Sequence, residues 1–346
     1  MSLRGVRPTQ PIRSSIFALT DRGKTRDHNE DTFLVADLAT AEPGRSSRFE
    51  EHQLGERGAI YLVADGMGGA AAGELASEMA ATEIHRYMAE AWRADPEVSE
   101  TRFTRHLRNA VELANLHLHE YALEHPEVRG MGTTATVAGV WADRLYLAQI
   151  GDSRAYLVRD GDARQLTRDQ SLTQRLVEVG ELTEEEAEAS ERRNIILQAL
   201  GPDERVKVDI SFQPLQRGDV LIICSDGLST VVRRDELVSM VAGEPDLSRL
   251  TDGLVRLANE RGGPDNITVV AVRFDGEGLP LTASEAPGYH EFLITDERPA
   301  LLPTAAFPAA SFPSAPAAVL RSGSPTGMAL VALSIVMLIL ALILIF

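Results

Sequence analysis

Short apolar runs that end in a carboxylate and glycine recur along the chain. Residues 59–64 form such a run, of the length typical of a buried strand, and Asp65 follows it directly. Three glycines come next, at Gly66, Gly68 and Gly69, where the backbone can approach a bound group closely. Residues 219–224 repeat the pattern and end in Ser225-Asp226-Gly227. The pattern predicts strands whose ends place carboxylates beside open backbone.

The remaining apolar periodicity predicts an α+β protein. Strands are expected at residues 14–20, 33–36, 133–140, 144–150, 155–159, 206–212 and 267–274. Helices are expected at residues 74–91, 100–124, 171–193, 234–242 and 247–259. Polar residues 40–57 are expected to form a loop. Two-residue turns, such as Asp160-Gly161, indicate that neighbouring strands pair in antiparallel sheets.

The pattern changes after residue 274. Residues 299–326 contain six prolines and eight alanines, which is typical of an extended linker. Residues 328–346 carry no charge and would span roughly 28 Å as a helix, close to the hydrocarbon thickness of a bilayer. They predict a transmembrane helix. Because Arg321 precedes it and no residue follows it, the large N-terminal part is expected in the cytoplasm, on a single-pass C-terminal anchor in the cell membrane.

The chain is thus expected to divide into four parts. These are an N-terminal arm (1–13), a catalytic domain (14–274), a tail with a Pro/Ala-rich linker (275–327) and a transmembrane helix (328–346). No apolar signal-peptide core is present in the first residues.

Composition restricts the function classes. The formal net charge of -17 disfavours binding to nucleic acid, whose phosphates need a basic surface. The single cysteine, Cys224, excludes a disulfide framework and a cysteine-based zinc site, and fits a reducing cytosol.

Carboxylates lie where strands meet loops. They are Glu30, Asp31, Asp65, Asp152, Asp226 and Asp265. Each alone is a common turn or cap residue. If the strands form two packed antiparallel sheets, their ends can converge on one edge, where the carboxylates would repel one another unless divalent cations neutralise them. All-oxygen ligands favour Mg²⁺ or Mn²⁺ over zinc. A dinucleotide loop at residues 66–73 is disfavoured, because the glycine spacing is wrong and Asp65 would face a pyrophosphate.

The motifs resemble those of the metal-dependent serine/threonine protein phosphatases of type 2C, in their bacterial form. The resemblance covers residues 14–274 in order. It rests on Gly23-x-x-Arg26-x-x-Asn29-Glu30-Asp31, Asp65-Gly66-Met67-Gly68-Gly69, Gly132-Thr133-Thr134, Gly151-Asp152-Ser153-Arg154, Ser225-Asp226-Gly227-Leu228 and Asp265-Asn266. It implies an α-β-β-α sandwich of two antiparallel sheets flanked by helices. It also implies hydrolysis of phosphoserine and phosphothreonine in proteins.

The resemblance further implies roles for single residues. Asp65 would bridge two tightly bound Mn²⁺ or Mg²⁺ ions, with the Gly66 carbonyl joining it. Asp226 and Asp265 would hold the first ion and Glu30 the second, with Asp31 supporting them. Asp152 would join Asp226 at a third, weaker ion. Arg26 would bind the substrate phosphate, and Asn266 would orient Asp265. Residues 167–200 would form a flap beside the site, and an activated water would attack phosphorus.

Two positions depart from the family pattern. Met67 replaces a histidine proposed as general acid in many eukaryotic members, and Gln170 replaces a histidine common beside the flap in bacterial ones. A catalytically weak relative that acts as a membrane-held phosphoprotein-binding module is the alternative, although such a protein has no need to keep Asp65, Asp226 and Asp265. A cysteine-based phosphatase is excluded, because Thr230 stands where it needs arginine.

The expected partners follow from these interpretations. They are phosphorylated proteins and, by analogy only, a membrane Ser/Thr kinase with its substrates. The predicted C-terminal helix would contact the lipid bilayer. No nucleic acid is expected, and the catalytic domain is expected to be monomeric.

Overall fold

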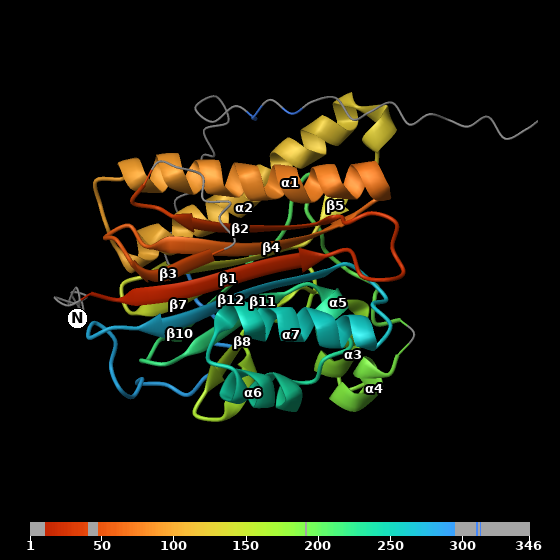
Figure 1. Cartoon of the computed structure of the whole chain (residues 1–346). Coiled ribbons are helices and arrows are strands. Elements are labelled where there is room, and N and C mark those ends of the chain that lie inside the picture. The colour runs from red at the N-terminus through yellow and green to blue at the C-terminus, as the bar shows by residue number, and fades with distance from the viewer. Residues whose placement is uncertain (1–10, 41–47, 191, 295–308, 311, 313–346) are drawn as a thin grey trace, which may run out of the picture. The chain divides into compact units, whose positions relative to one another are not determined.

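Two antiparallel sheets form the centre of the molecule (Figure 1). The computed structural model describes residues 11–40, 48–190, 192–294, 309–310 and 312. In this part of the chain, the first sheet has the order β3 (Arg48–Gln53), β1 (Arg13–Asp21), β12 (Ile267–Asp275), β11 (Val220–Cys224), β8 (Arg154–Arg159) and β9 (Asp162–Gln165). The second has the order β10 (Asp209–Pro214), β7 (Arg144–Ile150), β6 (Ala135–Trp141), β4 (Ala59–Met67) and β2 (Asp31–Asp37), with β5 (Gly132–Thr133) paired to the end of β4.

Helices cover the outer faces of both sheets (Figure 1). The second sheet is covered by α1 (Ala70–Tyr87), the π-helical turn η1 (Met88–Trp92) and α2 (Glu100–Glu124), with the short η2 (Pro126–Val128) after it. The first sheet is covered by α5 (Asp226–Ser229), α6 (Arg234–Gly243) and α7 (Leu247–Glu260). Between β9 and β10 lie α3 (Leu172–Glu178) and α4 (Glu184–Glu188). The layers are therefore α-β-β-α, as the resemblance implied.

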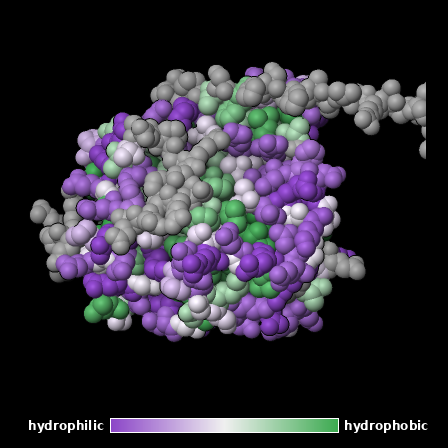
Figure 2. All heavy atoms as spheres, viewed as in Figure 1, coloured by the Kyte–Doolittle hydropathy of each residue, from purple (hydrophilic) through white to green (hydrophobic). Residues whose placement is uncertain are grey.

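Hydrophobic cores hold these layers together. One lies between the sheets and includes Tyr61, Leu147 and Val272, all fully buried. Another lies between the first sheet and α7, where Leu254 and Ala258 pack with Ile222 and Val269. Because β12 is buried on both faces, it is apolar almost throughout, as its sequence pattern indicated. The face seen in Figure 2 is mostly hydrophilic, which fits a chain that buries its apolar residues in these cores.

Several elements differ from the sequence expectations, for example β10, which begins three residues later than expected. Residues 48–53 form the edge strand β3 instead of loop, because an edge strand can be held by backbone pairing with β1 and needs few apolar side chains. Residues 171–193 do not form one helix: α3 ends before Gly180, whose φ is 77°, and a capping box of Thr183 and Glu186 starts α4. The first helix begins at Ala70, earlier than expected.

The predicted transmembrane helix, residues 328–346, and most of the predicted linker lie outside the described residues. Within the ranges that the structure does describe, no helix combines the length and apolarity needed to cross a membrane.

The packed chain extends beyond Phe274, where the sequence pattern placed the end of the catalytic domain. Leu279 is buried in the core between the sheets. The Phe212 N–H donates to the His290 carbonyl at 2.9 Å, and the Phe292 N–H donates to the Ile210 carbonyl at 2.8 Å. These bonds cover the free edge of β10. Residues 276–294 are therefore part of the folded domain.

Truncation tests this extension. A chain that ends at residue 294 should keep the thermal midpoint of the domain, whereas one that ends at residue 275 should melt about 5 °C lower or more, because it loses buried Leu279 and uncovers β10. Circular dichroism melting of both forms gives the comparison. Equal midpoints would show that residues 276–294 contribute nothing to stability.

Candidate metal centre

Strand order brings four carboxylates to one end of the two sheets. In the second sheet, Asp31 opens β2 and stands opposite Asp65 at the end of β4. In the first sheet, Asp226 follows β11, and Asp265 precedes β12, which pairs with β11. Asp152 lies in the turn between β7 and β8, where the chain passes from one sheet to the other.

Asp31 is held by hydroxyl groups from the opposite sheet. The Ser225 and Thr268 hydroxyls both donate to its Oδ2, each at 2.7 Å. All three side chains are buried, with Asp31 7% exposed. Because Ser225 follows β11 and Thr268 lies in β12, these bonds fix the start of β2 against the other sheet.

Asn266 fixes the loop that carries Arg26 and Glu30. Its Oδ1 accepts from the Glu30 N–H at 2.8 Å, while its Nδ2 donates to the carbonyls of Arg22 and His28 at 2.9 and 2.8 Å. One buried amide therefore ties three points of this loop to the start of β12. The resemblance implied that Asn266 orients Asp265. The structure adds these three hydrogen bonds from the Asn266 side chain to the loop.

The backbone around Asp65 is equally constrained. The Asp65 N–H donates to the Thr134 hydroxyl at 3.0 Å, and the Thr134 N–H donates to the Asp65 carbonyl at 2.9 Å. The first turn of α1 passes close to Glu30, since a Cβ added at Gly73 would lie 1.9 Å from the Glu30 Oε2. A side chain at position 73 would therefore displace the Glu30 carboxylate.

Burial and mutual repulsion raise the carboxyl pKa values. Burial raises the pKa of Asp31 to about 7, and repulsion from Asp226 and Asp265 raises it in the same direction. The hydrogen bonds from the two hydroxyls lower this pKa and so offset part of the increase. Burial and repulsion from Asp226 raise the pKa of Asp152 to about 7. Desolvation and the charge of Asp265 raise the pKa of Asp226 to about 6.

Asp65 lies at the centre of this repulsion. Burial raises its pKa well above the ordinary value, and the charges of all four other aspartates raise it further: Asp31, Asp226, Asp152 and Asp265. Burial also raises the pKa of Glu30. The structure thus brings every proposed carboxylate ligand into one electrostatic cluster.

Arg26 lies at the rim of this cluster. Its guanidinium is 55% exposed and donates to Asp265 Oδ2 at 2.7 Å. That hydrogen bond raises the pKa of Arg26, and the charges of Asp265, Glu30 and Asp226 act in the same direction. The residue proposed to bind phosphate is therefore beside the carboxylates and open to solvent.

The donor set fits divalent cations. Among the described residues, Asp31 Oδ1 and Asp226 Oδ1 are buried and have no hydrogen-bond partner, which is unfavourable unless a cation satisfies them. Within the described ranges, no three His, Cys, Asp or Glu side chains are already arranged to coordinate a metal ion. Asp265, for example, accepts a hydrogen bond from Arg26 instead. A cation would therefore have to draw Asp265 from Arg26.

The two departures from the family pattern have defined positions. Met67 pairs with Gly132 where β4 meets β5. Gln170 holds the flap segment, residues 167–200, to the Asp152 turn: its Oε1 accepts from the Gly151 N–H at 3.0 Å, and its carbonyl accepts from the Leu197 N–H at 2.7 Å. An amide thus supplies the link between flap and turn.

The hydroxyl groups that support the site were not assigned from the sequence. Thr134 and Ser225 stand in quoted motifs, which was the available signal, but Thr268 had none. Arg154 also received no role; it forms a partly buried ion pair with Asp169 at 2.7 Å, next to Asp152.

A two-sheet sandwich with clustered carboxylates and a rim arginine has the donor chemistry of metal-assisted phosphate-ester hydrolases. Comparison with known proteins makes this specific. The family model of protein phosphatase 2C matches residues 48–268. The serine/threonine phosphatase stp of Listeria monocytogenes is 37% identical over 257 residues, which cover 74% of this chain and 94% of the relative.

Solved structures agree. The S. agalactiae serine/threonine phosphatase superposes with a TM-score of 0.65 and 32% identity, covering 75% of this chain and 99% of that one. The catalytic domain of phosphatase PstP in complex with 2 manganese ions gives a TM-score of 0.62 and 31% identity, covering 76% and 99%. The chain therefore belongs to the protein phosphatase 2C family, in its bacterial form. It is an enzyme of the protein serine/threonine phosphatase class.

Proposed function

We propose that the chain hydrolyses phosphoserine and phosphothreonine in proteins at a centre that holds two Mn²⁺ or Mg²⁺ ions. The observation that carries the proposal is the pair of buried, unpartnered oxygens on Asp31 and Asp226, within a cluster of carboxylates whose pKa values are raised. The manganese ions of the similar PstP structure support the choice of metal.

The residues divide the work as follows. Asp65 and the Gly66 carbonyl would contact both ions, Asp226 and Asp265 the first, and Glu30 the second, while Asp31 supports the group. Asp152 with Asp226 would hold a third, weaker ion. When bound, the ions would supply an activated water and neutralise charge on the phosphate.

Arg26 would orient the phosphate. Its planar fork can donate two parallel hydrogen bonds to a phosphate, and it is half-exposed at the rim, where a phosphorylated side chain can reach it. Asp265 accepts from one nitrogen of Arg26 and so keeps the guanidinium beside the cluster until a cation takes Asp265. Met67 cannot donate a proton, so a water held at the centre would protonate the leaving oxygen.

A direct assay tests this function. With Mn²⁺, the enzyme should release phosphate from a phosphothreonine peptide, and excess EDTA should abolish the release. A phosphotyrosine peptide of the same sequence is the matched substrate control. Turnover that survives complete metal removal would contradict the proposal, and binding of the phosphothreonine peptide without turnover would favour a phosphoprotein-binding module.

We further propose that residues 328–346 anchor the enzyme to the cell membrane, with the catalytic domain in the cytoplasm. The support is their uncharged sequence and its length. Tethering would raise the enzyme concentration near membrane phosphoproteins, such as a membrane Ser/Thr kinase and its substrates.

Cell fractionation checks this anchor. Full-length protein should sediment with membranes, and a chain that ends at residue 327 should be soluble, with little change in the turnover of a small phosphate ester. The catalytic residues all lie before residue 275, so deletion leaves them intact. Full-length protein in the soluble fraction would refute the anchor.

A further inference from the structure

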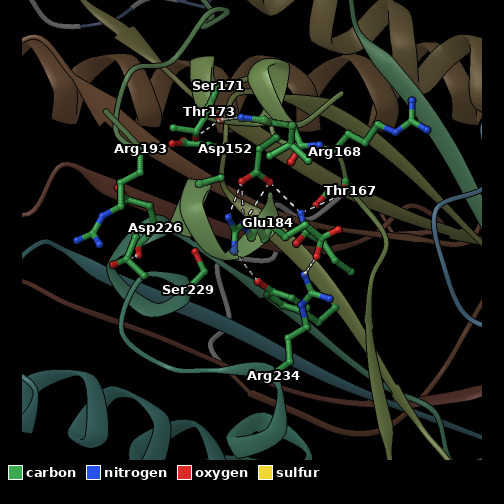
Figure 3. Close-up of a pocket in the computed structure, with 18 of the residues that line it drawn as sticks. Asp152, Thr167, Arg168, Ser171, Thr173, Glu184, Arg193, Asp226, Ser229 and Arg234 are labelled. Carbon is green, nitrogen blue, oxygen red and sulfur yellow. Dashed lines mark hydrogen bonds and ion pairs between the residues drawn. The ribbon is translucent and has the colours of Figure 1, made fainter. Parts of the chain in front are cut away.

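A cavity of about 610 Å³ lies beside the candidate metal centre. Asp152 and Asp226 belong to its lining, together with residues of the flap segment and of α6 (Figure 3). If the proposed function holds, the phosphate of a phosphoprotein binds at the cations that these carboxylates hold. The residues on either side of the phosphorylated residue then lie at this cavity. The groups that line it can therefore select among phosphoproteins.

The lining of the cavity is less acidic than the protein as a whole. The chain carries a formal net charge of -17. Six arginines nevertheless line the cavity: Arg154, Arg164, Arg168, Arg193, Arg233 and Arg234. The carboxylates that face them are Asp152, Asp169, Asp226, Glu184 and Glu185. The cavity is thus close to neutral in an acidic protein, and its specificity depends on which arginines are already engaged.

Some of these arginines have firm partners. Arg154 forms three hydrogen bonds to the Asp169 carboxylate, at 2.7 to 3.2 Å, and is mostly buried. Arg168 stacks on Tyr289, with 4.1 Å between its guanidinium carbon and the ring centroid. In Figure 3, the labelled Arg168 extends away from the cavity. Neither guanidinium is placed to meet a ligand in the cavity.

Arg234 is different. It is the first residue of α6, 45% exposed, and its guanidinium faces Glu184 across the cavity (Figure 3). Their closest N–O distance is 3.8 Å, longer than a hydrogen bond, and Glu184 is 73% exposed. Glu184 begins α4 in the flap segment. An exposed ion pair without a hydrogen bond contributes little, so another anion can displace Glu184.

We propose that Arg234 is the binding site for a second anionic group of the phosphoprotein substrate, a carboxylate or a further phosphate near the hydrolysed residue. Glu184 occupies this site in the structure and leaves it when an acidic substrate binds. The enzyme therefore favours phosphorylated segments with acidic neighbours. This inference rests on the proposed function and specifies its substrate class.

A peptide series tests the site. Three phosphothreonine peptides carry neutral neighbours, glutamates, or a second phosphorylated residue. For each, kcat and KM are measured with Mn²⁺ and compared with the turnover of para-nitrophenyl phosphate, which has no neighbouring residues. The wild-type enzyme should favour the two anionic peptides, and the glutamate and phosphate arms show which anion it takes.

Two variants and a control locate the effect. Arg234→Gln should lower kcat/KM for the anionic peptides about fivefold, mainly through KM, because one partly exposed ion pair is lost. Glu184→Gln should raise kcat/KM for the anionic peptides by roughly twofold or more, since the Glu184 carboxylate no longer competes with the substrate for Arg234. Arg256→Gln, on α7 and outside the cavity lining, should change none of these ratios.

The outcomes separate the two proposals. Equal kcat/KM for all three peptides, or an unchanged preference in Arg234→Gln, overturns the anion site while the phosphatase function stands. If no peptide is turned over, the proposed function fails, and fluorescence anisotropy with the same peptides then decides the anion site. Thermal melting of each variant confirms that it is folded.

Discussion

Replacing Asp226 with asparagine is expected to abolish Mn²⁺-dependent turnover and to stabilise the metal-free protein. The amide keeps the shape of the side chain but removes the charge that Asp226 would contribute to two metal sites. Turnover of a phosphothreonine peptide should fall at least about 100-fold, or roughly 2.7 kcal/mol of activation free energy. Phosphate release with Mn²⁺ measures this.

Asp226→Asn is expected to lower turnover but to raise the stability of the metal-free protein. Because the pKa of Asp226 is raised to about 6, its ionisation disfavours the folded state. The stability contributed by the protonated form is fully present below the ordinary pKa near 4 and is lost as the pH rises through about 6. In EDTA at pH 7.5, the Asp226→Asn variant should therefore melt about 2–3 °C above the wild type.

A matched carboxylate controls for general charge effects. Asp162 is 56% exposed in the β8–β9 hairpin, away from the cluster, so Asp162→Asn should change neither turnover nor melting. If Asp226→Asn keeps substantial Mn²⁺-dependent activity, Asp226 is not a ligand. If its metal-free form melts below the wild type, repulsion at the cluster is not the dominant effect at this position.

The fold could be predicted where burial alone determines the pattern. The strands β7 and β11 and the helix α2 follow long apolar or helical periodicities, and their expected bounds agree with the structure within one residue. Edge and surface elements could not be predicted in this way. β3 is specified by pairing with β1, and residues 290–292 by pairing with β10, so neither leaves a strong local signal.

The candidate site divides in the same way. The carboxylates could be found because each stands in a recognisable motif at a strand end, and the structure brings them together. Thr268 and Arg234 could not be found from the sequence, because the role of each depends on a distant partner. Thr268 contacts Asp31 across 237 positions of sequence, and Arg234 meets Glu184 only because the fold brings the start of α4 near the start of α6. Spacing within the sequence cannot reveal such pairs.

Replacing Asn266 with alanine is expected to damage stability and metal binding together. The side chain makes three hydrogen bonds, to the Glu30 N–H and to the carbonyls of Arg22 and His28, and it is 5% exposed. Its removal costs three part-buried hydrogen bonds, each of which contributes about 0.5–1.5 kcal/mol. The metal-free protein should melt roughly 5–10 °C lower.

Loss of metal affinity follows from the same bonds. The loop that Asn266 holds carries Arg26 and Glu30 and leads into Asp31, so a looser loop should weaken Mn²⁺ binding, which calorimetric titration measures. Asn259→Ala is the matched control, because the Asn259 amide donates a single bond, to Asp21 Oδ1 at 3.0 Å. It should lower the midpoint by a few degrees at most and leave Mn²⁺ affinity unchanged. Equal effects of the two variants would show that Asn266 contributes only general stability and does not position the metal ligands.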